Sequence, residues 1–138
     1  MTDKIQIEQA VILCGGLGTR LRPFTNNNPK PMVRVNDRPF LDYLLDQMLD
    51  NGIKRVLLLT GYLSDKIVSH YGNNYKSLEL SYSQGDVSLD TAQRLELAAA
   101  QIDDYFLLMY SDNYSPFILQ QAIDAFDADQ SLRLHLSK

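Results

Sequence analysis

The chain has 138 residues, 45% of them apolar, and a formal net charge of −4 from 17 acidic and 13 basic side chains. This length fits one domain, and the apolar content is too high for a disordered chain. The acidic balance argues against a nucleic-acid scaffold, which is usually basic overall. Positive charge is nevertheless concentrated in one stretch, which holds Arg20, Arg22, Lys30, Arg34 and Arg38.

The cysteine content and the N-terminal sequence bear on the compartment. A single cysteine, Cys14, excludes an intrachain disulfide and a zinc site built on paired cysteines. We expect Cys14 to be a small buried residue rather than a nucleophile. The segment MTDKIQIEQA lacks the apolar core of a signal peptide, and no apolar run approaches the ~20 residues of a membrane span. These features predict a cytoplasmic protein with no membrane or nucleic-acid partner.

The first predicted element is a strand over residues 10–14, an unbroken apolar run of the kind buried on both faces of a sheet. A glycine-rich segment follows it directly. A helix is expected to begin at Pro39, because a proline at the first helical position loses no hydrogen bond. Apolar residues then recur at three- and four-residue spacing as far as Leu49. Gly52 is expected to end this helix as a C′ glycine.

The rest of the chain alternates between strands and helices. Predicted strands cover residues 56–59, 78–83, 105–110 and 132–136, and predicted helices cover residues 63–71, 90–101 and 115–126. We expect Gly72 to stop the first of these helices and Asp90 or Thr91 to lie near the N-cap of the second. The alternation predicts an α/β fold, a Rossmann-like three-layer sandwich with a mostly parallel sheet and helices on both faces. Ligands bind such sheets at the carboxyl ends of the strands.

The glycine-rich segment after the first strand fits some phosphate-binding loops poorly. A Walker A loop needs a glycine followed by lysine and then serine or threonine, which does not occur here. The dinucleotide-binding fingerprint needs a third small residue where this chain has Leu21, which would obstruct close packing of helix on strand.

A different anion-binding loop is consistent with the residues themselves. Gly15, Gly16 and Gly18 would let the backbone approach a ligand and adopt positive φ. Consecutive backbone N–H groups in such a turn form an anion-binding concavity. Thr19 can donate a hydroxyl, and Arg20 can fork across phosphate oxygens. A polyphosphate is therefore the predicted ligand class.

Lys30 follows between two prolines, which stiffen the backbone around it. Such a lysine suits charge stabilisation during attack at phosphorus. The run Gly15-Gly16-Leu17-Gly18-Thr19-Arg20-Leu21, then Pro23, Thr25, Pro29-Lys30-Pro31-Met32, Val35 and Pro39, resembles the signature of sugar-1-phosphate nucleotidyltransferases. The resemblance continues at Gly61-Tyr62 and Ser111-Asp112-Asn113. Residues 36–44 are most similar to bacterial mannose- or heptose-1-phosphate guanylyltransferases.

The resemblance implies an enzyme in which a sugar 1-phosphate attacks the α-phosphorus of a nucleoside triphosphate and releases pyrophosphate. The product would be an NDP-sugar for cell-surface polysaccharide synthesis, with Mg²⁺ as cofactor. Arg20 and Lys30 would be the catalytic residues, and Asp112 would bind the metal. The expected nucleotide-binding residues are Leu13, Gly15, Gly16, Gly18, Thr19, Gln84 and Thr91. The family resemblance also allows a homo-oligomer.

The sequence departs from the family pattern in its length and at single residues, among them Cys14, where the family commonly has alanine. Ser111 and Asp90 stand where the family usually has glycine, and an acidic Asp90 could accept a hydrogen bond from a base amine. Family enzymes are also longer. We therefore expect residues 1–138 to be the nucleotide-binding N-terminal part of a truncated nucleotidyltransferase (GT-A-like) domain, with the downstream sugar-binding half absent and with little turnover alone.

Several alternatives remain open from the sequence. The chain could be a non-catalytic sensor of nucleotides or NDP-sugars with the same fold, or it could transfer a nucleotidyl group to a non-sugar phosphate such as phosphocholine. Asp112 could be a helix cap alone. The base and the sugar are not readable from the residues.

Overall fold

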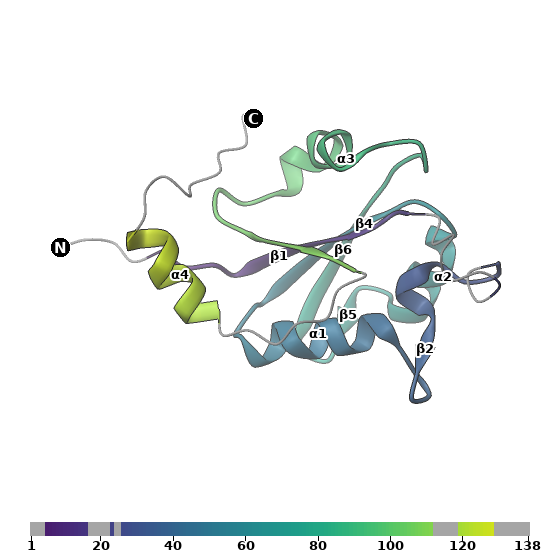
Figure 1. Ribbon diagram of the computed structural model, residues 1–138, viewed down its shortest axis with the longest axis horizontal. Helices are drawn as coiled ribbons and strands as arrows, with labels where there is room; N and C mark the ends of the chain where they lie inside the picture. The colour runs from purple at the N-terminus through teal and green to yellow at the C-terminus, as the bar shows by residue number, and fades with distance from the viewer. Residues whose placement is uncertain (1–4, 17–22, 24–25, 112–118, 129–138) are drawn as a thin grey trace.

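The computed structural model describes residues 5–16, 23, 26–111 and 119–128, and Figure 1 shows a central sheet with helices on both sides. The sheet contains β1 (Gln9–Cys14), β4 (Arg55–Thr60), β5 (Asn74–Tyr75), β6 (Leu78–Gln84) and β7 (Leu107–Tyr110). The α-helices are α1 (Phe40–Asp50), α2 (Ser64–Tyr71), α3 (Thr91–Ala98) and α4 (Leu119–Ala128). Two 3₁₀ turns, η2 (Lys30–Met32) and η3 (Ala99–Gln101), and a hairpin of β2 (Arg34–Val35) and β3 (Arg38–Pro39) complete the set.

The strand order β5-β6-β4-β1-β7 confirms the predicted Rossmann-like sheet. β1 pairs in parallel with β4 on one edge and with β7 on the other, and β4 pairs in parallel with β6. β5 alone in this sheet, within the described residues, runs antiparallel. The chain proceeds from β1 through β4 to β6 and then returns to the far side of β1. The carboxyl ends of β1 and β7 therefore meet at a topological switch point, where open α/β sheets bind ligands.

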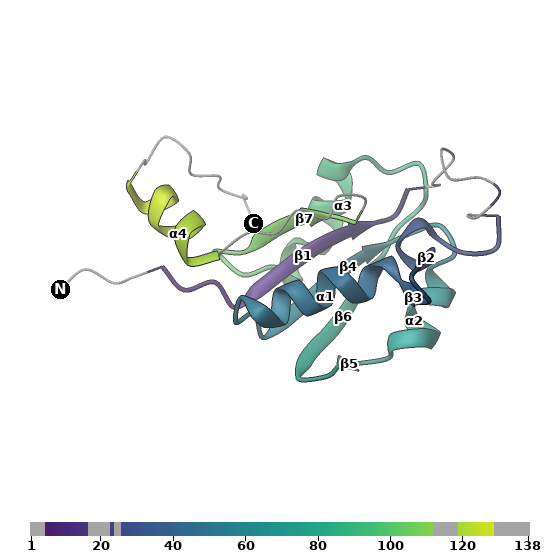
Figure 2. The same cartoon turned by 60° about the horizontal axis from the view of Figure 1, so that its bottom comes forward.

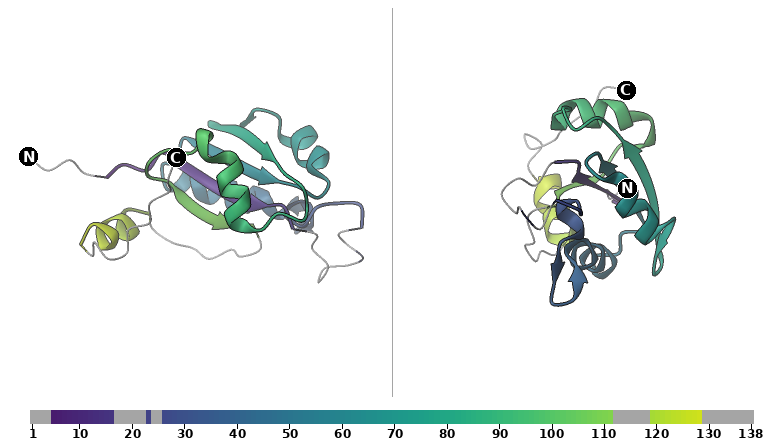
Figure 3. Two further views of the ribbon diagram at one scale, coloured as in Figure 1. Left: turned by 90° about the horizontal axis from the view of Figure 1, so that it is seen from above. Right: turned by 90° about the vertical axis from the view of Figure 1, so that its right-hand side faces the viewer.

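Helices cover both faces of this sheet, as the edge-on view in Figure 3 shows for α3 and α1. In β1, Ala10, Ile12 and Cys14 belong to the core that α1, α2 and α4 cover. Val11 and Leu13 belong to a second, smaller core under α3. Figure 2 shows α1 lying along the strands on its side of the sheet. Fully burying one large aliphatic side chain contributes roughly 1.5–3 kcal/mol, so an unbroken apolar strand is stable here because neither face meets water.

The predicted element boundaries shift in several places. The segment predicted as one helix over 90–101 is α3 followed by η3, and the strand predicted over 105–110 begins at Leu107. Pro39 is the N-cap of α1 and pairs within β3, so the helix starts one residue later than expected. The sequence analysis missed the β2–β3 hairpin and β5. The predicted strand over 132–136 and the start of the last helix at residues 115–118 lie outside the described residues.

The end of α1 follows the prediction closely. Gly52 has φ of +78°, as a C′ glycine requires. The N–H of Gly52 donates to the Leu49 carbonyl at 3.1 Å, and the N–H of Ile53 donates to the Met48 carbonyl at 3.0 Å, which is the Schellman pattern. The Asn51 side-chain oxygen then accepts a hydrogen bond from the Leu119 N–H at 2.7 Å, so the end of α1 also anchors the start of α4.

A network of charged and phenolic side chains joins β3, α1 and β5. Arg38 donates to the Asp46 carboxylate at 2.7 Å and to Asp42 at 3.3 Å. Tyr75 and Lys76 donate to the other Asp46 oxygen at 2.8 and 2.9 Å. Asp46 therefore receives three donors from two separate segments.

None of the helices among the described residues has the length and hydropathy of a membrane span.

This network contributes to the dependence of stability on pH. Burial acts to raise the pKa of Asp46, but hydrogen bonds from Arg38, Lys76 and Tyr75 outweigh burial and lower that pKa from 3.8 to about 2. A carboxyl whose pKa is lower in the folded state stabilises the fold above its unfolded pKa. This contribution is present above about pH 4 and is lost as the pH falls from 3.8 towards 2.

Asp46→Asn should lower the free energy of unfolding at pH 7 by about 1–2 kcal/mol, after allowance for solvent screening. It should also flatten the decline in stability between pH 4 and pH 2, because the titrating group is gone. Urea unfolding followed by circular dichroism across this pH range measures both effects. Asp50→Asn, on the exposed side of the same helix, is the matched control. An unchanged pH dependence in Asp46→Asn would contradict the assignment.

Candidate nucleotide-binding site

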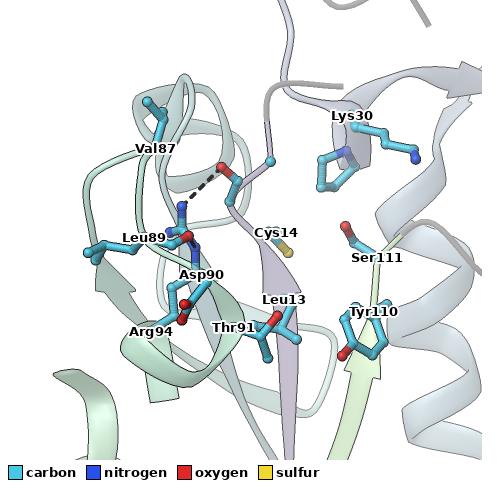
Figure 4. Close-up of a pocket in the computed structure, with 13 residues that line it drawn as sticks. Leu13, Cys14, Lys30, Val87, Leu89, Asp90, Thr91, Arg94, Tyr110 and Ser111 are labelled. Atoms are coloured by element: carbon cyan, nitrogen blue, oxygen red, sulfur yellow. Dashed lines mark hydrogen bonds between the residues drawn. The ribbon is translucent and has the colours of Figure 1, made fainter. Parts of the chain in front are cut away.

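A cavity of about 550 Å³ lies at the carboxyl ends of β1 and β7. Its size is in the range of small-molecule sites. One wall comes from the segment between β6 and α3, the opposite wall from η2 and the end of β7, and the end of β1 lies between them, as Figure 4 shows. The lining residues are Leu13, Cys14, Gly15, Gly16, Lys30, Pro31, Val87, Leu89, Asp90, Thr91, Arg94, Tyr110 and Ser111.

Half of the predicted site residues lie in this cavity. The structure brings together Leu13, Gly15, Gly16, Lys30 and Thr91. Gln84 ends β6 with an exposed side chain and is not among the lining residues, so its contact with a base stays a prediction.

Four further site residues fall outside the described part of the chain. They are Gly18, Thr19, Arg20 and Asp112. Their roles stay predictions.

Lys30 begins η2, directly after an extended proline. Pro29 has φ of −66° and ψ of 156°, and both Pro29 and Pro31 are buried. The flanking rings therefore restrict the backbone on both sides of the lysine. Figure 4 places Lys30 above Ser111, across the cavity from Leu89 and Asp90. Lys30 is thus a half-buried lining residue of one wall, and Figure 4 draws its ammonium on the side away from Cys14.

The glycines at the end of β1 act differently from the prediction. Among the described glycines, Gly52 and Gly72 are the ones with positive φ, so the positive φ expected for Gly15 and Gly16 is wrong. Gly15 leaves space for Arg94, because an added Cβ would lie 2.3 Å from its guanidinium carbon and the buried guanidinium would have to move. Gly16 has open space around its Cα, so its backbone is accessible from the cavity.

Arg94 is the site residue that the sequence analysis missed. It lies in the first turn of α3 and is 6% exposed. Its guanidinium donates to four backbone carbonyls: Asp86 at 2.9 Å, Leu89 at 3.2 Å, Thr60 at 3.2 Å and Gly15 at 3.3 Å. A signal was present in the sequence, because Arg94 and Ala98 lie four residues apart on one face of the helix predicted over 90–101, and both are buried.

The N-terminus of α3 confirms Asp90 as its cap. The Asp90 carboxylate accepts from the Gln93 N–H at 2.8 Å, and the Gln93 side-chain oxygen accepts from the Asp90 N–H at 2.9 Å. This reciprocal pair is a capping box. Asp90 has φ of −81°, an ordinary value for an L-residue. An aspartate is therefore tolerated where the family usually has glycine.

Cys14 and Ser111 end neighbouring strands at the bottom of the cavity. The Cys14 side chain is buried, and burial raises the pKa of its thiol to about 12, although a hydrogen bond with Ser111 lowers it slightly. The thiol is therefore protonated near neutral pH, which confirms a packing residue rather than a nucleophile. The Ser111 N–H donates to the Leu13 carbonyl at 3.1 Å and extends the β1–β7 pairing by one residue.

Substitutions at Asp90 distinguish the stability that comes from its hydrogen bond as the N-cap of α3 from any effect of its negative charge. Asp90→Ala should lower the free energy of unfolding by about 1 kcal/mol, because the Gln93 N–H loses its acceptor. Asp90→Ser keeps a capping oxygen and should retain most of that stability. Thermal or urea unfolding of the two variants gives the comparison. Equal losses in both would argue against the capping role.

The sequence of this chain is similar to those of known proteins. The chain matches the profile of the nucleotidyl transferase family over residues 9–136. The UTP–glucose-1-phosphate uridylyltransferase AglF of Haloferax volcanii is 37% identical over 105 residues, which are 76% of this chain and 43% of that protein. The D-glycero-alpha-D-manno-heptose 1-phosphate guanylyltransferase of Campylobacter jejuni is 31% identical over 131 residues, 94% of this chain and 54% of that protein.

Solved structures of other proteins share the fold of this chain. The crystal structure of HddC from Yersinia pseudotuberculosis complexed with GMP-PN has a TM-score of 0.76 at 29% identity, over 87% of this chain and 54% of that one. The chain thus spans about half the length of the relatives it matches. Enzymes of this family generally use a divalent metal. The family match over residues 9–136 shows that the chain belongs to the nucleotidyl transferase family.

Proposed function

We propose that this chain carries the nucleotide-binding half of an enzyme that makes an NDP-sugar. An oxygen of the sugar 1-phosphate would attack the α-phosphorus of a nucleoside triphosphate. The bond from that phosphorus to the oxygen bridging to the β-phosphate would break, and pyrophosphate would leave. The observation that carries the proposal is the cavity that joins Gly15, Gly16 and Lys30 in a chain of this family.

Lys30 is the proposed electrostatic catalyst among the described residues. It lies on the cavity wall opposite the β6–α3 segment, so a nucleotide held over Gly15 and Gly16 would have its phosphates near this wall. A cation there would stabilise negative charge that develops at the α-phosphate, and the flanking prolines restrict the backbone that carries it. Arg20 would hold the leaving pyrophosphate.

Magnesium is the divalent metal that we assign to this site. Within the described residues, no group of three His, Cys, Asp or Glu side chains could form a protein-only metal site. Asp112 directly follows the cavity residue Ser111 and would supply one carboxylate. Mg²⁺ commonly binds one or two carboxylates together with phosphates and water, so this donor set fits. When bound, the metal would offset charge on the triphosphate.

A purine triphosphate, GTP, is the proposed nucleotide. Asp90 lines the cavity, and one of its carboxylate oxygens is used in the capping box. The other oxygen could accept a hydrogen bond from an exocyclic base amine, which guanine, adenine and cytosine have and uracil and thymine lack. The heptose 1-phosphate guanylyltransferase relative supports the same base. UTP is the alternative, because the uridylyltransferase relative is 37% identical.

Binding of the five common triphosphates tests the nucleotide half directly. Thermal unfolding of the chain would be measured with GTP, UTP, CTP, dTTP and ATP, each with Mg²⁺. A ligand at about 100 times its Kd stabilises the folded state by roughly 2.7 kcal/mol, which raises Tm by several degrees. We expect GTP to give the largest increase. Lys30→Ala should reduce that increase, because phosphate charge loses a partner.

Lys54→Ala is the matched control, because Lys54 is exposed and precedes β4 at the opposite end of the sheet. It should leave the GTP effect unchanged. No increase in Tm with any triphosphate would contradict a nucleotide site in this chain.

A pyrophosphate-release assay with mannose 1-phosphate, glucose 1-phosphate and phosphocholine separates the acceptors. Release with phosphocholine alone would favour the non-sugar alternative. Nucleotide binding without release of pyrophosphate would indicate that this chain binds the nucleotide only. The sugar contacts would then come from the part of the relatives that this chain does not cover.

A further inference from the structure

The buried guanidinium of Arg94 has a role beyond packing. We propose that Arg94 is a positioning residue. It holds the backbone at Gly15 and Gly16, directly after β1, in the shape that binds the nucleotide; these two residues are called the nucleotide loop below. This inference rests on the proposed nucleotide site, although it requires no particular base or sugar. Its basis is a 6% exposed arginine whose hydrogen bonds reach three separate segments at the carboxyl end of the sheet.

The acceptors of Arg94 surround one end of the cavity. Thr60 ends β4, Gly15 directly follows β1, and Asp86 and Leu89 lie in the segment between β6 and α3. Figure 4 shows the bond from Arg94 to the Gly15 carbonyl, which joins the end of β1 to the cavity wall that carries Leu89 and Asp90. Gly15, Asp86 and Leu89 lie outside the paired strands, and Arg94 ties them to Thr60, the last paired residue of β4.

The four hydrogen bonds of Arg94 to backbone carbonyls form a clamp. Because the peptide group is planar, this clamp also determines the direction of the neighbouring N–H groups. In a trans peptide the carbonyl and the following N–H point in opposite directions. Because the Gly15 carbonyl points at Arg94, the N–H of Gly16 points away from it. Gly16 has open space around its Cα and lines the cavity. Arg94 therefore orients the Gly16 N–H for a ligand. The same argument applies to Val87, whose preceding carbonyl on Asp86 also accepts from Arg94.

The chemistry of the clamp requires arginine in particular. A guanidinium has five donors in a rigid plane, whereas a lysine ammonium has three on a flexible stem. Four acceptors around one side chain exceed what lysine can satisfy. The positive charge also stays under the loop, where it favours an anionic ligand over a neutral one.

Two glycines provide the space that the clamp occupies. A Cβ at Gly15 would lie 2.3 Å from the Arg94 guanidinium carbon, and a Cβ at Gly61 would lie 3.0 Å from one of its terminal nitrogens. The Cβ direction at Gly15 is thus towards Arg94 and not towards the ligand. An alanine at Gly15 would act on the nucleotide through Arg94, which makes the pair suitable for a double-mutant cycle.

Affinity for GTP and UTP with Mg²⁺, measured by titration calorimetry, tests the proposal in wild type, Arg94→Ala, Gly15→Ala and the double variant. If the clamp keeps the loop competent, its loss should weaken binding about tenfold or more, because apparent affinity scales with the competent fraction. Gly15→Ala should weaken binding similarly by displacing the guanidinium. The double variant should bind no more weakly than Arg94→Ala, because the added methyl group then occupies vacated space. Arg94→Lys should lie between wild type and Arg94→Ala.

The control separates positioning from general destabilisation. Arg55 pairs in a bidentate manner with Asp103 at the opposite end of β4, at 2.5 and 3.2 Å. Arg55→Ala should lower Tm and leave the nucleotide Kd within about twofold, since exposed pairs act on local stability. All titrations are made below the melting temperature of each variant. If Arg94→Ala does not fold, Arg94→Lys and Gly15→Ala carry the comparison.

Each result decides between the hypotheses. Unchanged affinity in folded Arg94 variants, or additive losses in the double variant, would overturn the positioning role while the nucleotide site stands. Failure of the wild type to bind any of the five common triphosphates would overturn the proposed function and this inference together.

Discussion

The pairing of β1 on both of its edges is the constraint on which the rest of the structure depends. β4 lies on one side of β1 and β7 on the other, both in parallel register. Since both faces are also covered, β1 can shift neither sideways nor in register without exposing apolar side chains. Its carboxyl end is thereby fixed next to the ends of its two neighbours, and the cavity forms where these ends meet.

Two polar clusters hold this framework together by different means. Arg38 is 40% exposed, and its side chain pairs with carboxylates on a solvent-facing side of α1. Arg94 is 6% exposed and donates only to carbonyls in its four hydrogen bonds described above. The first cluster joins elements of secondary structure, and its strength depends on pH and salt. The second joins loops inside the protein, where screening by solvent is weak.

The sequence predicted those parts of the fold that depend on interactions between residues close together in the chain. The apolar run of β1, the periodicity of α1 and the C′ position of Gly52 all follow from neighbouring residues. The role of Gly15 does not, because its partner Arg94 is 79 positions away in the sequence. The signature motif therefore indicated that Gly15 matters, while the expected reason, positive φ, was wrong.

The short β-elements were missed for a similar reason. β2, β3 and β5 each have two residues, too few to show an alternating pattern. They form because the surrounding structure brings them together: β5 pairs with β6 across a tight turn, and Tyr75 and Lys76 contact Asp46 on α1. In the candidate site, the sequence identified Lys30 and the end of β1 from the family motif. It overlooked the arginine on the buried face of α3.

The antiparallel β5 also has a consequence for behaviour in concentrated solution. An exposed edge of a β-sheet offers free N–H and C=O groups to other chains, and long flat edges promote fibril growth. Here the edge beyond β6 is closed by a strand of two residues, followed by Lys76, whose φ of +53° turns the backbone away from an extended course. A second molecule would find Leu78 and Glu79 of β6 already paired and a positive charge beside them. The short strand thus protects the start of β6 against pairing with another chain.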